Sequence, residues 1–305
     1  METVLSTRQL TKNFGRLCAV NQLTLEVQRG QVFGMLGPNG SGKTTTLGML
    51  MGVVNRTQGE FKWFGQVATH ETRKKIGAVL EHAIFYPYLS GQKNLELTAM
   101  IKGAPKEHIA KVLDIVELTP RKEDKYRTYS LGMKQRLAIA SALLNDPIVL
   151  ILDEPTNGLD PMGIAEIRTI IKRIAADGKT IILASHLLDE VQKVCSHFAI
   201  LRKGNLVHSG PVDDVGRGEE TVEVFAYHDD LSALLQHFEG TLSLKKEGAN
   251  YLVKLKQEFH SQDLNRFLFG KGIVASHLVT QKKSLEKQFL EILSEAENKS
   301  HLTRS

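Results

Sequence analysis

The chain has 305 residues, which is longer than one typical domain, so we expect about two domains. Apolar residues make up 42% of the sequence, enough for a buried core, but no apolar run approaches the roughly 18 residues that a membrane span needs. The formal net charge of +5 comes from basic and acidic residues scattered along the chain, so it is weak evidence for a nucleic-acid partner.

The N-terminal residues and the two cysteines indicate a cellular compartment. Residues 1–8 have neither the basic start nor the apolar stretch of a secretion signal, and we predict a cytosolic location. Cys18 and Cys195 are too few for a disulfide framework and lack the spacing of metal ligands. We expect both thiols to be reduced and structural.

A glycine-rich segment is the first chemical motif along the chain. It reads Gly37-Pro38-Asn39-Gly40-Ser41-Gly42-Lys43-Thr44, which fits the pattern G-x-x-x-x-G-K-[ST], between a predicted strand at 31–36 and a predicted helix at 45–50. Backbone N–H groups and the positive end of such a helix hold a polyanion. We expect Lys43 to reach the β- and γ-phosphates of a nucleoside triphosphate and the Thr44 hydroxyl to bind Mg²⁺. Thr45 completes the predicted phosphate-binding set.

The segments after this loop predict one α/β nucleotide-binding domain with an inserted helical part. Residues up to about 80 favour strands, residues from about 81 to 145 favour helices, and residues from about 146 to 210 alternate between strands and helices. The apolar run at 148–152 predicts a central parallel strand that ends in Asp153 and Glu154. Asp153 is a candidate Mg²⁺ ligand, and Glu154 is placed to polarise an attacking water. Two acids that merely end a strand before Pro155 are the structural alternative, which the upstream loop disfavours.

A serine and a glycine begin a further predicted helix within the segment Tyr129–Ala140. Ser130 and Gly132 can bind an anion there, because a helix N-terminus offers free N–H groups. The segment resembles the Leu-Ser-Gly-Gly-Gln signature of ABC transporter ATPases, from which Leu131 and Met133 depart. The resemblance implies that Ser130 and Gly132 contact the γ-phosphate of an ATP held by a second copy of the chain. From these residues alone, a simple N-capped amphipathic helix is an equally good interpretation.

Three other residues follow the order of the same family. His186, after a predicted strand at 180–183, matches the switch histidine that senses the γ-phosphate. Asp160, in Gly158–Pro161, matches a loop that contacts the opposite subunit. Phe14 stands where the family places an aromatic ring on adenine, and a place in the hydrophobic core is its alternative.

Glu81 departs from the family pattern, which usually has Gln at this junction. A carboxylate is a good ligand for a hard cation, so Glu81 joins Thr44 and Asp153 as a candidate Mg²⁺ ligand. A solvated acid without metal contact is the alternative. The aromatic stretch that follows, residues 85–89, either packs internally or accepts a cytoplasmic helix of a membrane subunit.

A second, smaller unit follows a predicted linker at 210–220. Strands are expected at 221–226, 251–255 and 273–279, and helices at 230–238 and 261–269. The order β-α-β-β-α-β indicates a ferredoxin-like α+β module. A last helix at 284–293 has an apolar face that we expect to pack in a core rather than to bind a partner. The predicted domains are therefore an ATPase domain at 1–212, an accessory domain at 219–297 and a polar tail at 298–305.

The resemblance spans residues 3–210 and extends to bacterial export ATPases of bacitracin, lantibiotic and drug resistance. It implies the fold of an ABC-type P-loop NTPase with a helical subdomain at about 81–145. It also implies a homodimer that sandwiches two ATP molecules with Mg²⁺ and hydrolyses them with Lys43, Glu154 and His186. Hydrolysis would drive a separate transmembrane permease, at the cytoplasmic face of a bacterial membrane, for a peptide, drug or lipid-like cargo.

Two alternatives to this function stay open. A non-transport ATPase of the same family could act as an ATP-driven switch on the ribosome or on nucleic acid. Such proteins generally carry two cassettes or long coiled coils, and the sequence has one phosphate loop and no such coiled coil, so we expect no nucleic-acid partner. The C-terminal module could also serve only to regulate the ATPase, which is compatible with transport.

Overall fold

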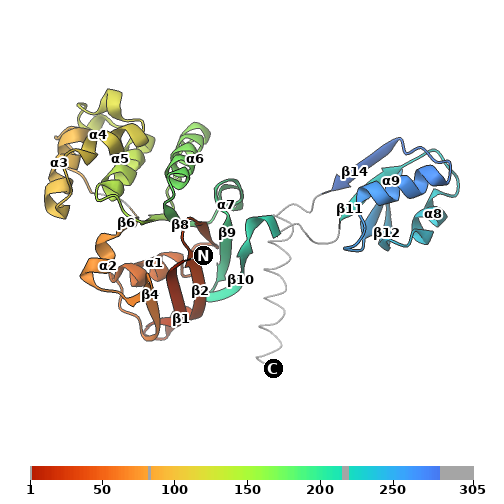
Figure 1. Ribbon diagram of the computed structural model, residues 1–305, viewed down its shortest axis with the longest axis horizontal. Coiled ribbons are helices and arrows are strands. Elements are labelled where there is room, and N and C mark those ends of the chain that lie inside the picture. Colours follow the sequence, from red (N-terminus) through yellow and green to blue (C-terminus); the bar gives the residue numbers. More distant parts are fainter. Residues whose placement is uncertain (1, 82–83, 215–219, 282–305) are drawn as a thin grey trace. The chain divides into compact units, whose positions relative to one another are not determined.

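The computed structural model describes residues 2–81, 84–214 and 220–281. The chain divides into two compact units, Met1–Val212 and Asp213–Ser305, which we call the N-terminal and the C-terminal unit. Figure 1 shows the elements of each unit with the labels used below. Within the described ranges, no helix is both long and apolar enough to cross a membrane.

A six-stranded sheet carries the N-terminal unit, in the strand order β10-β9-β3-β8-β7-β6. Its strands are β3 (Val32–Leu36), β6 (Ile76–Val79), β7 (Val149–Asp153), β8 (Thr180–Ser185), β9 (His197–Arg202) and β10 (Asn205–Pro211). Neighbouring strands run parallel, except for β9 and β10, which are antiparallel. Every residue of β3, β7 and β8 is buried, as their continuous apolar runs predict for strands covered on both faces.

A four-stranded antiparallel sheet forms the second layer of this unit, in the order β2-β1-β4-β5. Its strands are β1 (Thr3–Phe14), β2 (Leu17–Gln28), β4 (Gln58–Trp63) and β5 (Gln66–Val67). Side chains from both sheets and from helix α1 (Lys43–Met51) belong to one hydrophobic core. Trp63 is fully buried in it and donates its indole N–H to the Leu50 carbonyl at 3.0 Å. This core fixes α1, which begins inside the glycine-rich loop.

The helices of the N-terminal unit follow local sequence signals. They are α2 (His70–Lys74), α3 (Gly91–Lys102), α4 (His108–Ile115), α5 (Leu131–Leu143), α6 (Pro161–Ala176) and α7 (Leu188–Val194). Helices α3, α4 and α5 follow β6 and precede β7 in the sequence, where the helical part is predicted, and they pack against one another (Figure 1). Ser90 caps α3 by accepting the Lys93 N–H at 3.2 Å, and Gly103 ends it in a left-handed conformation at φ 65°.

The C-terminal unit alternates strands and helices around its own core. Its elements are β11 (Thr221–Phe225), α8 (Leu231–His237), β12 (Thr241–Glu247), β13 (Asn250–Leu255), α9 (Ser261–Gly270) and β14 (His277–Gln281). The four strands form an antiparallel sheet in the order β12-β13-β11-β14. Alternate residues of β11, Val222 and Val224, are fully buried against Leu235 and Leu264 in this core. The period of two in the sequence thus marks the buried face of the sheet.

Two strands of the C-terminal unit differ from the sequence-based expectation. Strand β12 fills the second strand position of the expected β-α-β-β-α-β order, but the sequence did not locate it, because most of its residues are exposed at the sheet edge and its apolar alternation is weak. Strand β14 begins at His277 rather than at residue 273, since Gly272 turns the chain at φ 76° and buried Ile273 packs in the core outside any strand. The helix predicted at 284–293 and the tail at 298–305 lie outside the described residues.

The two cysteines are free and have very different surroundings. Cys18 is exposed and its Sγ lies 3.5 Å from the Val20 carbonyl oxygen, whereas Cys195 is buried at the end of α7. Burial, with a smaller contribution from the charge of Glu190, raises the pKa of the Cys195 thiol to about 12. Cys195 packs tightly: a Cβ atom placed on Gly34 in β3 would lie 3.0 Å from its Sγ.

Candidate functional site

The glycine-rich loop connects the carboxyl end of β3 to the N-terminus of α1. Glycine is required at two of its positions because other backbone atoms approach closely. A Cβ on Gly37 would lie 2.3 Å from the Leu201 carbonyl oxygen, and one on Gly42 would lie 2.5 Å from the Ala19 carbonyl oxygen. Gly42 also caps α1 at φ 104°, a conformation that favours glycine.

Some residues of the glycine-rich loop are exposed and others are buried. Pro38, Asn39 and Gly40 are exposed, Ser41 and Gly42 are buried, Thr44 is exposed and Thr45 is half-buried. The Ser41 hydroxyl is buried without a hydrogen-bond partner among the described residues. Free N–H groups at a helix N-terminus and an unsatisfied hydroxyl are suited to phosphate oxygens. The chain therefore brings the predicted phosphate-binding residues together in one loop, with polar groups suited to an anion.

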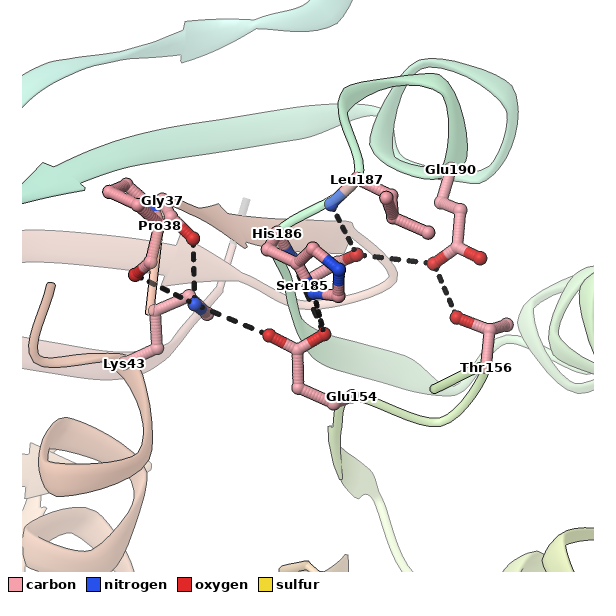
Figure 2. A network of polar contacts seen from close by, with 9 residues as sticks. All are labelled: Gly37, Pro38, Lys43, Glu154, Thr156, Ser185, His186, Leu187 and Glu190. Atoms are coloured by element: carbon pink, nitrogen blue, oxygen red, sulfur yellow. Dashed lines mark hydrogen bonds and ion pairs between the residues drawn. The ribbon is translucent and has the colours of Figure 1, made fainter. Parts of the chain in front are cut away.

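Lys43 lies under this loop, with its side chain only 5% exposed. Its Nζ donates to the Gly37 carbonyl at 2.7 Å and to the Pro38 carbonyl at 3.3 Å. It also lies 3.2 Å from Glu154 Oε1, in an ion pair (Figure 2). The lysine thus joins the loop to the end of β7.

Asp153 is buried at the end of β7, next to the first turn of α1. Burial raises the pKa of its carboxyl, and the charges of Glu154 and Glu81 act in the same direction, while a hydrogen bond from Thr44 and the charge of Lys43 lower it. Asp153 Oδ1 has no hydrogen-bond partner within the described ranges. A buried, unsatisfied carboxylate oxygen beside a threonine hydroxyl suits a divalent cation.

Glu154 lies between two basic groups. Its Oε1 is close to Lys43, and its Oε2 lies 2.7 Å from His186 Nδ1 and 3.4 Å from the His186 backbone N–H. Its backbone has φ 47°, in the left-handed region that a residue with a side chain rarely adopts. The carboxylate of Glu154 lies between Lys43, the first residue of α1, and His186, which directly follows β8.

Glu190 is a component of the site that the sequence analysis did not find. This residue of α7 is only 5% exposed, and its Oε2 accepts hydrogen bonds from Thr156 Oγ1 at 2.6 Å and from Ser185 Oγ at 3.1 Å (Figure 2). Ser185 Oγ in turn accepts the Leu187 N–H at 3.0 Å. The available signal was an acid four residues after His186, on a helix too short to show periodicity.

Glu81 follows strand β6 and is exposed, with a left-handed backbone at φ 57°. Its charge contributes to the raised pKa of Asp153, so the two carboxylates lie near one another. In the described part of the chain, no three or more His, Cys, Asp and Glu side chains are grouped to hold a metal ion. A cation at this site needs oxygen ligands from hydroxyl groups or from a bound phosphate.

The remaining predicted residues do not join this cluster, and their described contacts are local. Ser130 caps α5 by accepting the Met133 N–H at 3.2 Å, and Asp160 caps α6 by accepting the Gly163 N–H at 2.8 Å. Gly132 has open space around it, since a Cβ there would meet only Leu159 Cδ2, at 4.0 Å.

Phe14 also stands apart, at the end of β1. Its ring is 49% exposed, with Lys12 Nζ 4.6 Å from the ring centre. It is therefore not a core residue, and an exposed aromatic ring of this kind can stack on a flat ligand.

Comparison with known proteins reveals similarity along nearly the whole chain. A family model described as "ABC transporter" matches residues 20–157. The chain is 41% identical to the uncharacterized ABC transporter ATP-binding protein YhcH of Bacillus subtilis, over 97% of each chain. It is 35% identical to the bacitracin transport ATP-binding protein BcrA of Bacillus licheniformis, over 96% of this chain and 98% of that protein.

The fold is also similar to solved structures. One is the dimeric post-hydrolysis state of the ATP-binding cassette MJ0796 bound to ADP and Pi, with a TM-score of 0.60 and 26% sequence identity. This similarity covers 68% of the chain and 98% of the cassette.

Proposed function

Because this chain belongs to the ABC transporter ATP-binding proteins and is one of their ATPases, we propose that it powers export through a separate membrane subunit. One observation carries the proposal for the site: the carboxylate of Glu154 lies between Lys43 and His186, directly beside the glycine-rich loop. Such a carboxylate can orient and deprotonate a water molecule next to a bound phosphate.

ATP binds, in this proposal, with its phosphates on the loop from Gly37 to Thr45. Lys43 exchanges the carbonyl oxygens of Gly37 and Pro38 for the β- and γ-phosphate oxygens, which are stronger partners because they are charged. The exposed ring of Phe14 stacks on the adenine.

Mg²⁺ is the metal that the donor set fits. The Thr44 hydroxyl and the unsatisfied Asp153 Oδ1 would hold it, with Glu81 as a further candidate ligand. When bound, Mg²⁺ neutralises charge on the β- and γ-phosphates.

Hydrolysis depends on how the side chains around the γ-phosphate are positioned. Glu154 holds the attacking water and takes up its proton, while His186 positions the γ-phosphate and orients Glu154 through their contact. Lys43 remains on the phosphates and stabilises the charge that the transition state spreads over their oxygens.

A second copy of the chain completes each ATP site in this proposal. The open space at Gly132, together with the exposed Ser130 and Asp160, supports a surface that faces another subunit. The dimeric state of the similar cassette MJ0796 supports the same arrangement. Each ATP then lies between the loop of one copy and the N-terminus of α5 of the other.

A membrane permease is the proposed partner of the helical subdomain. Phe85 is buried and packs on Tyr126, with ring centres 5.2 Å apart, whereas Tyr86 and Tyr88 are exposed. The Phe85 ring therefore packs inside the protein. The Tyr86 and Tyr88 rings are available to a permease helix at the cytoplasmic face of a bacterial membrane. The similarity to BcrA, a bacitracin transport protein, supports a peptide, drug or lipid-like cargo.

The proposed domains are the ATPase domain at 1–212, an accessory domain at 219–297 and a tail at 298–305. We propose a ferredoxin-like fold for the accessory domain, because its strand order places β11 and β13 in the middle of an antiparallel β-α-β-β-α-β sheet. A regulatory role for this domain is compatible with transport.

The test is an affinity pull-down of the full-length Glu154→Gln variant with ATP and Mg²⁺ from detergent-solubilised native membranes, followed by mass spectrometry. We expect a polytopic membrane protein in stoichiometric amount. Lys43→Ala is the matched control, and with it ATP should no longer change the yield of this protein. Ribosomal proteins or nucleic acid in place of a membrane subunit would overturn the export proposal in favour of an ATP-driven switch.

A further inference from the structure

A buried carboxylate connects the two strand ends that carry Glu154 and His186. Glu190 Oε2 accepts from Thr156 Oγ1 and from Ser185 Oγ, as Figure 2 shows. Thr156 lies two residues after Glu154, and Ser185 lies directly before His186. We call this set of three side chains, Thr156, Ser185 and Glu190, the Glu190 bridge.

The Glu190 bridge contains a buried carboxylate, whose burial costs free energy that an apolar side chain of similar size would not cost. Glu190 is 5% exposed, and in the described residues its Oε1 has no hydrogen-bond partner. Glu190, Thr156 and Arg168 line a cavity of about 10 Å³, and Arg168 Nε also lacks a hydrogen bond there. Burying a carboxylate without a directly paired cation is expensive, and such groups are found preferentially at functional sites.

Helix α7 holds the Glu190 carboxylate at a fixed place relative to strand β3. A Cβ on Gly34 of β3 would lie 2.8 Å from Val191 Cγ1, so the strand and the helix are in close contact. Strand β3 leads directly into the glycine-rich loop. The bridge thus ties the segments of Glu154 and His186 to α7, and α7 packs on β3, the strand that precedes the glycine-rich loop.

We propose that Glu190 is a positioning residue for hydrolysis, which holds Glu154 and His186 at the separation that the reaction needs. This inference rests on the proposed roles of Glu154 and His186. It predicts an effect on turnover rather than on ATP binding, because the hydrogen bonds described for the three side chains join them to one another and to the Leu187 N–H. In the described hydrogen bonds, the glycine-rich loop meets only the backbone of Ser185 among these residues, through the Gly37 N–H at 3.3 Å from the Ser185 carbonyl oxygen, and the proposed substitutions keep that carbonyl. A displacement of about 1 Å in such a pair is enough to slow an enzymatic reaction substantially.

The test removes one hydroxyl from the bridge and keeps its shape. In the full-length protein, Thr156→Val should lower kcat for ATP hydrolysis by about 10-fold, the effect of one buried hydrogen bond, and leave the KM for ATP within about twofold. Thr156→Ser restores a hydroxyl and should return kcat to within about twofold of the original. Thr169→Val is the control, because the hydrogen bond described for the Thr169 hydroxyl goes to the Ala165 carbonyl of its own helix.

Two further measurements distinguish a positioning role of the Glu190 bridge from a general loss of stability: a second bridge variant, and the Thr156→Val substitution in a chain that already carries His186→Ala. Ser185→Ala, which removes the other hydroxyl, should also lower kcat at constant KM. With His186→Ala already present, Thr156→Val should change kcat little further, because the pair it aligns is gone. Normal kcat in both Thr156→Val and Ser185→Ala, or equal loss in Thr169→Val, would overturn the inference.

Glu154→Gln distinguishes this inference from the proposed function. If Glu154→Gln hydrolyses ATP normally, the role of Glu154 is wrong and the inference about Glu190 fails with it. If Glu154→Gln is inactive while both bridge variants turn over normally, only the role of Glu190 is wrong.

Discussion

At the residue scale, the side chain of Glu154 contacts those of Lys43 and His186 in the candidate site. In the proposed mechanism, nucleotide binding changes these contacts. Lys43 is saturated by two carbonyl oxygens and by Glu154, and Glu154 is also engaged by His186. In the proposed mechanism, a phosphate that takes Lys43 frees one carboxylate oxygen of Glu154 for water. The proposal therefore links ATP binding and activation of the carboxylate through one lysine.

Removing that lysine tests the link. Lys43→Ala should weaken ATP binding by at least about 10-fold, because a charge-assisted hydrogen bond to phosphate is lost. Isothermal titration with ATP and Mg²⁺ measures the effect, and Lys245→Ala, in the C-terminal unit, should bind ATP normally. Unchanged affinity in Lys43→Ala would contradict the assigned role.

Asp153 offers a prediction on pH. Burial, more than any other cause, raises the pKa of its carboxyl, so the folded chain favours the protonated acid. Its contribution to stability is therefore present below the ordinary Asp pKa and is lost as the pH rises through the folded-state pKa. At pH 7.5 the charged carboxylate costs stability, and Asp153→Asn should raise the Tm of the nucleotide-free protein.

This gain in Tm should shrink as the pH is lowered toward about 4, the ordinary range of an aspartic acid. Differential scanning calorimetry across this pH range measures it. Asp177→Asn, at an exposed position, is the control and should show no such trend. A lower Tm of Asp153→Asn at pH 7.5 would contradict the argument.

At the element scale, local signals in the sequence predicted the elements around the phosphate loop well. The glycine pattern predicted the loop, and the apolar run before Asp153 predicted β7. The Glu190 bridge was not predictable in this way, because Thr156 and Glu190 are 34 residues apart and only the folded chain brings them together. Strand β12 was implied by the predicted order but was not located, for a different reason: an exposed edge strand needs few apolar residues.

The C-terminal unit has its own polar anchor at the start of β11. Glu220 accepts hydrogen bonds from the Ser261 N–H at 3.2 Å and from Thr280 Oγ1 at 3.0 Å, and lies 3.1 Å from His260 Nδ1. Partial burial on its own raises the pKa of Glu220, but the hydrogen bonds from Ser261, Thr280 and His260 together lower it. The stability that Glu220 contributes is thus present at neutral pH and is lost as the pH falls through its lowered pKa.

Glu220→Ala should destabilise this unit by about 1–3 kcal/mol at pH 7, because several hydrogen bonds are lost together. Hydrogen exchange of β11 and α9 in the full-length protein measures the change, and the difference should diminish in acid. Glu239→Ala, at an exposed position of the same unit, is the control. Equal protection of β11 in Glu220→Ala and in the original protein would show that the anchor is unimportant.

At the scale of the whole molecule, the proposed ATP site is incomplete in one chain. Ser130, Gly132 and Asp160 make only local contacts in the described residues, although family resemblance assigns them to nucleotide. These residues can contact a nucleotide if that nucleotide is bound to the glycine-rich loop of another copy of the chain. The sequence could indicate these residues by motif, but the proposed partner belongs to a second copy of the chain, which a single sequence does not show.

Gly132→Asp tests this arrangement. The side chain has room in one chain and adds an acid to a helix N-terminus, which is favourable, so folding and ATP binding should be retained. In the Glu154→Gln background, ATP-dependent dimerisation should weaken by at least about 10-fold, because the new carboxylate faces the γ-phosphate. Analytical ultracentrifugation with ATP and Mg²⁺ measures it.

Gly270→Asp, in the C-terminal unit and equally free of steric conflict, is the control and should dimerise normally. Undiminished dimerisation of Gly132→Asp would exclude the N-terminus of α5 from the interface.

Because the two cysteines differ in exposure, a fluorescent dye can be attached to one of them without any mutation. A thiol with a pKa of about 12 in a buried site resists maleimide reagents near neutral pH, while the exposed Cys18 is open to them. Cys18 directly precedes Ala19, whose carbonyl oxygen closely approaches Gly42 of the phosphate loop. A dye attached there lies beside the proposed nucleotide site, so the unmodified sequence is suited to single-site labelling and to real-time measurement of ATP binding.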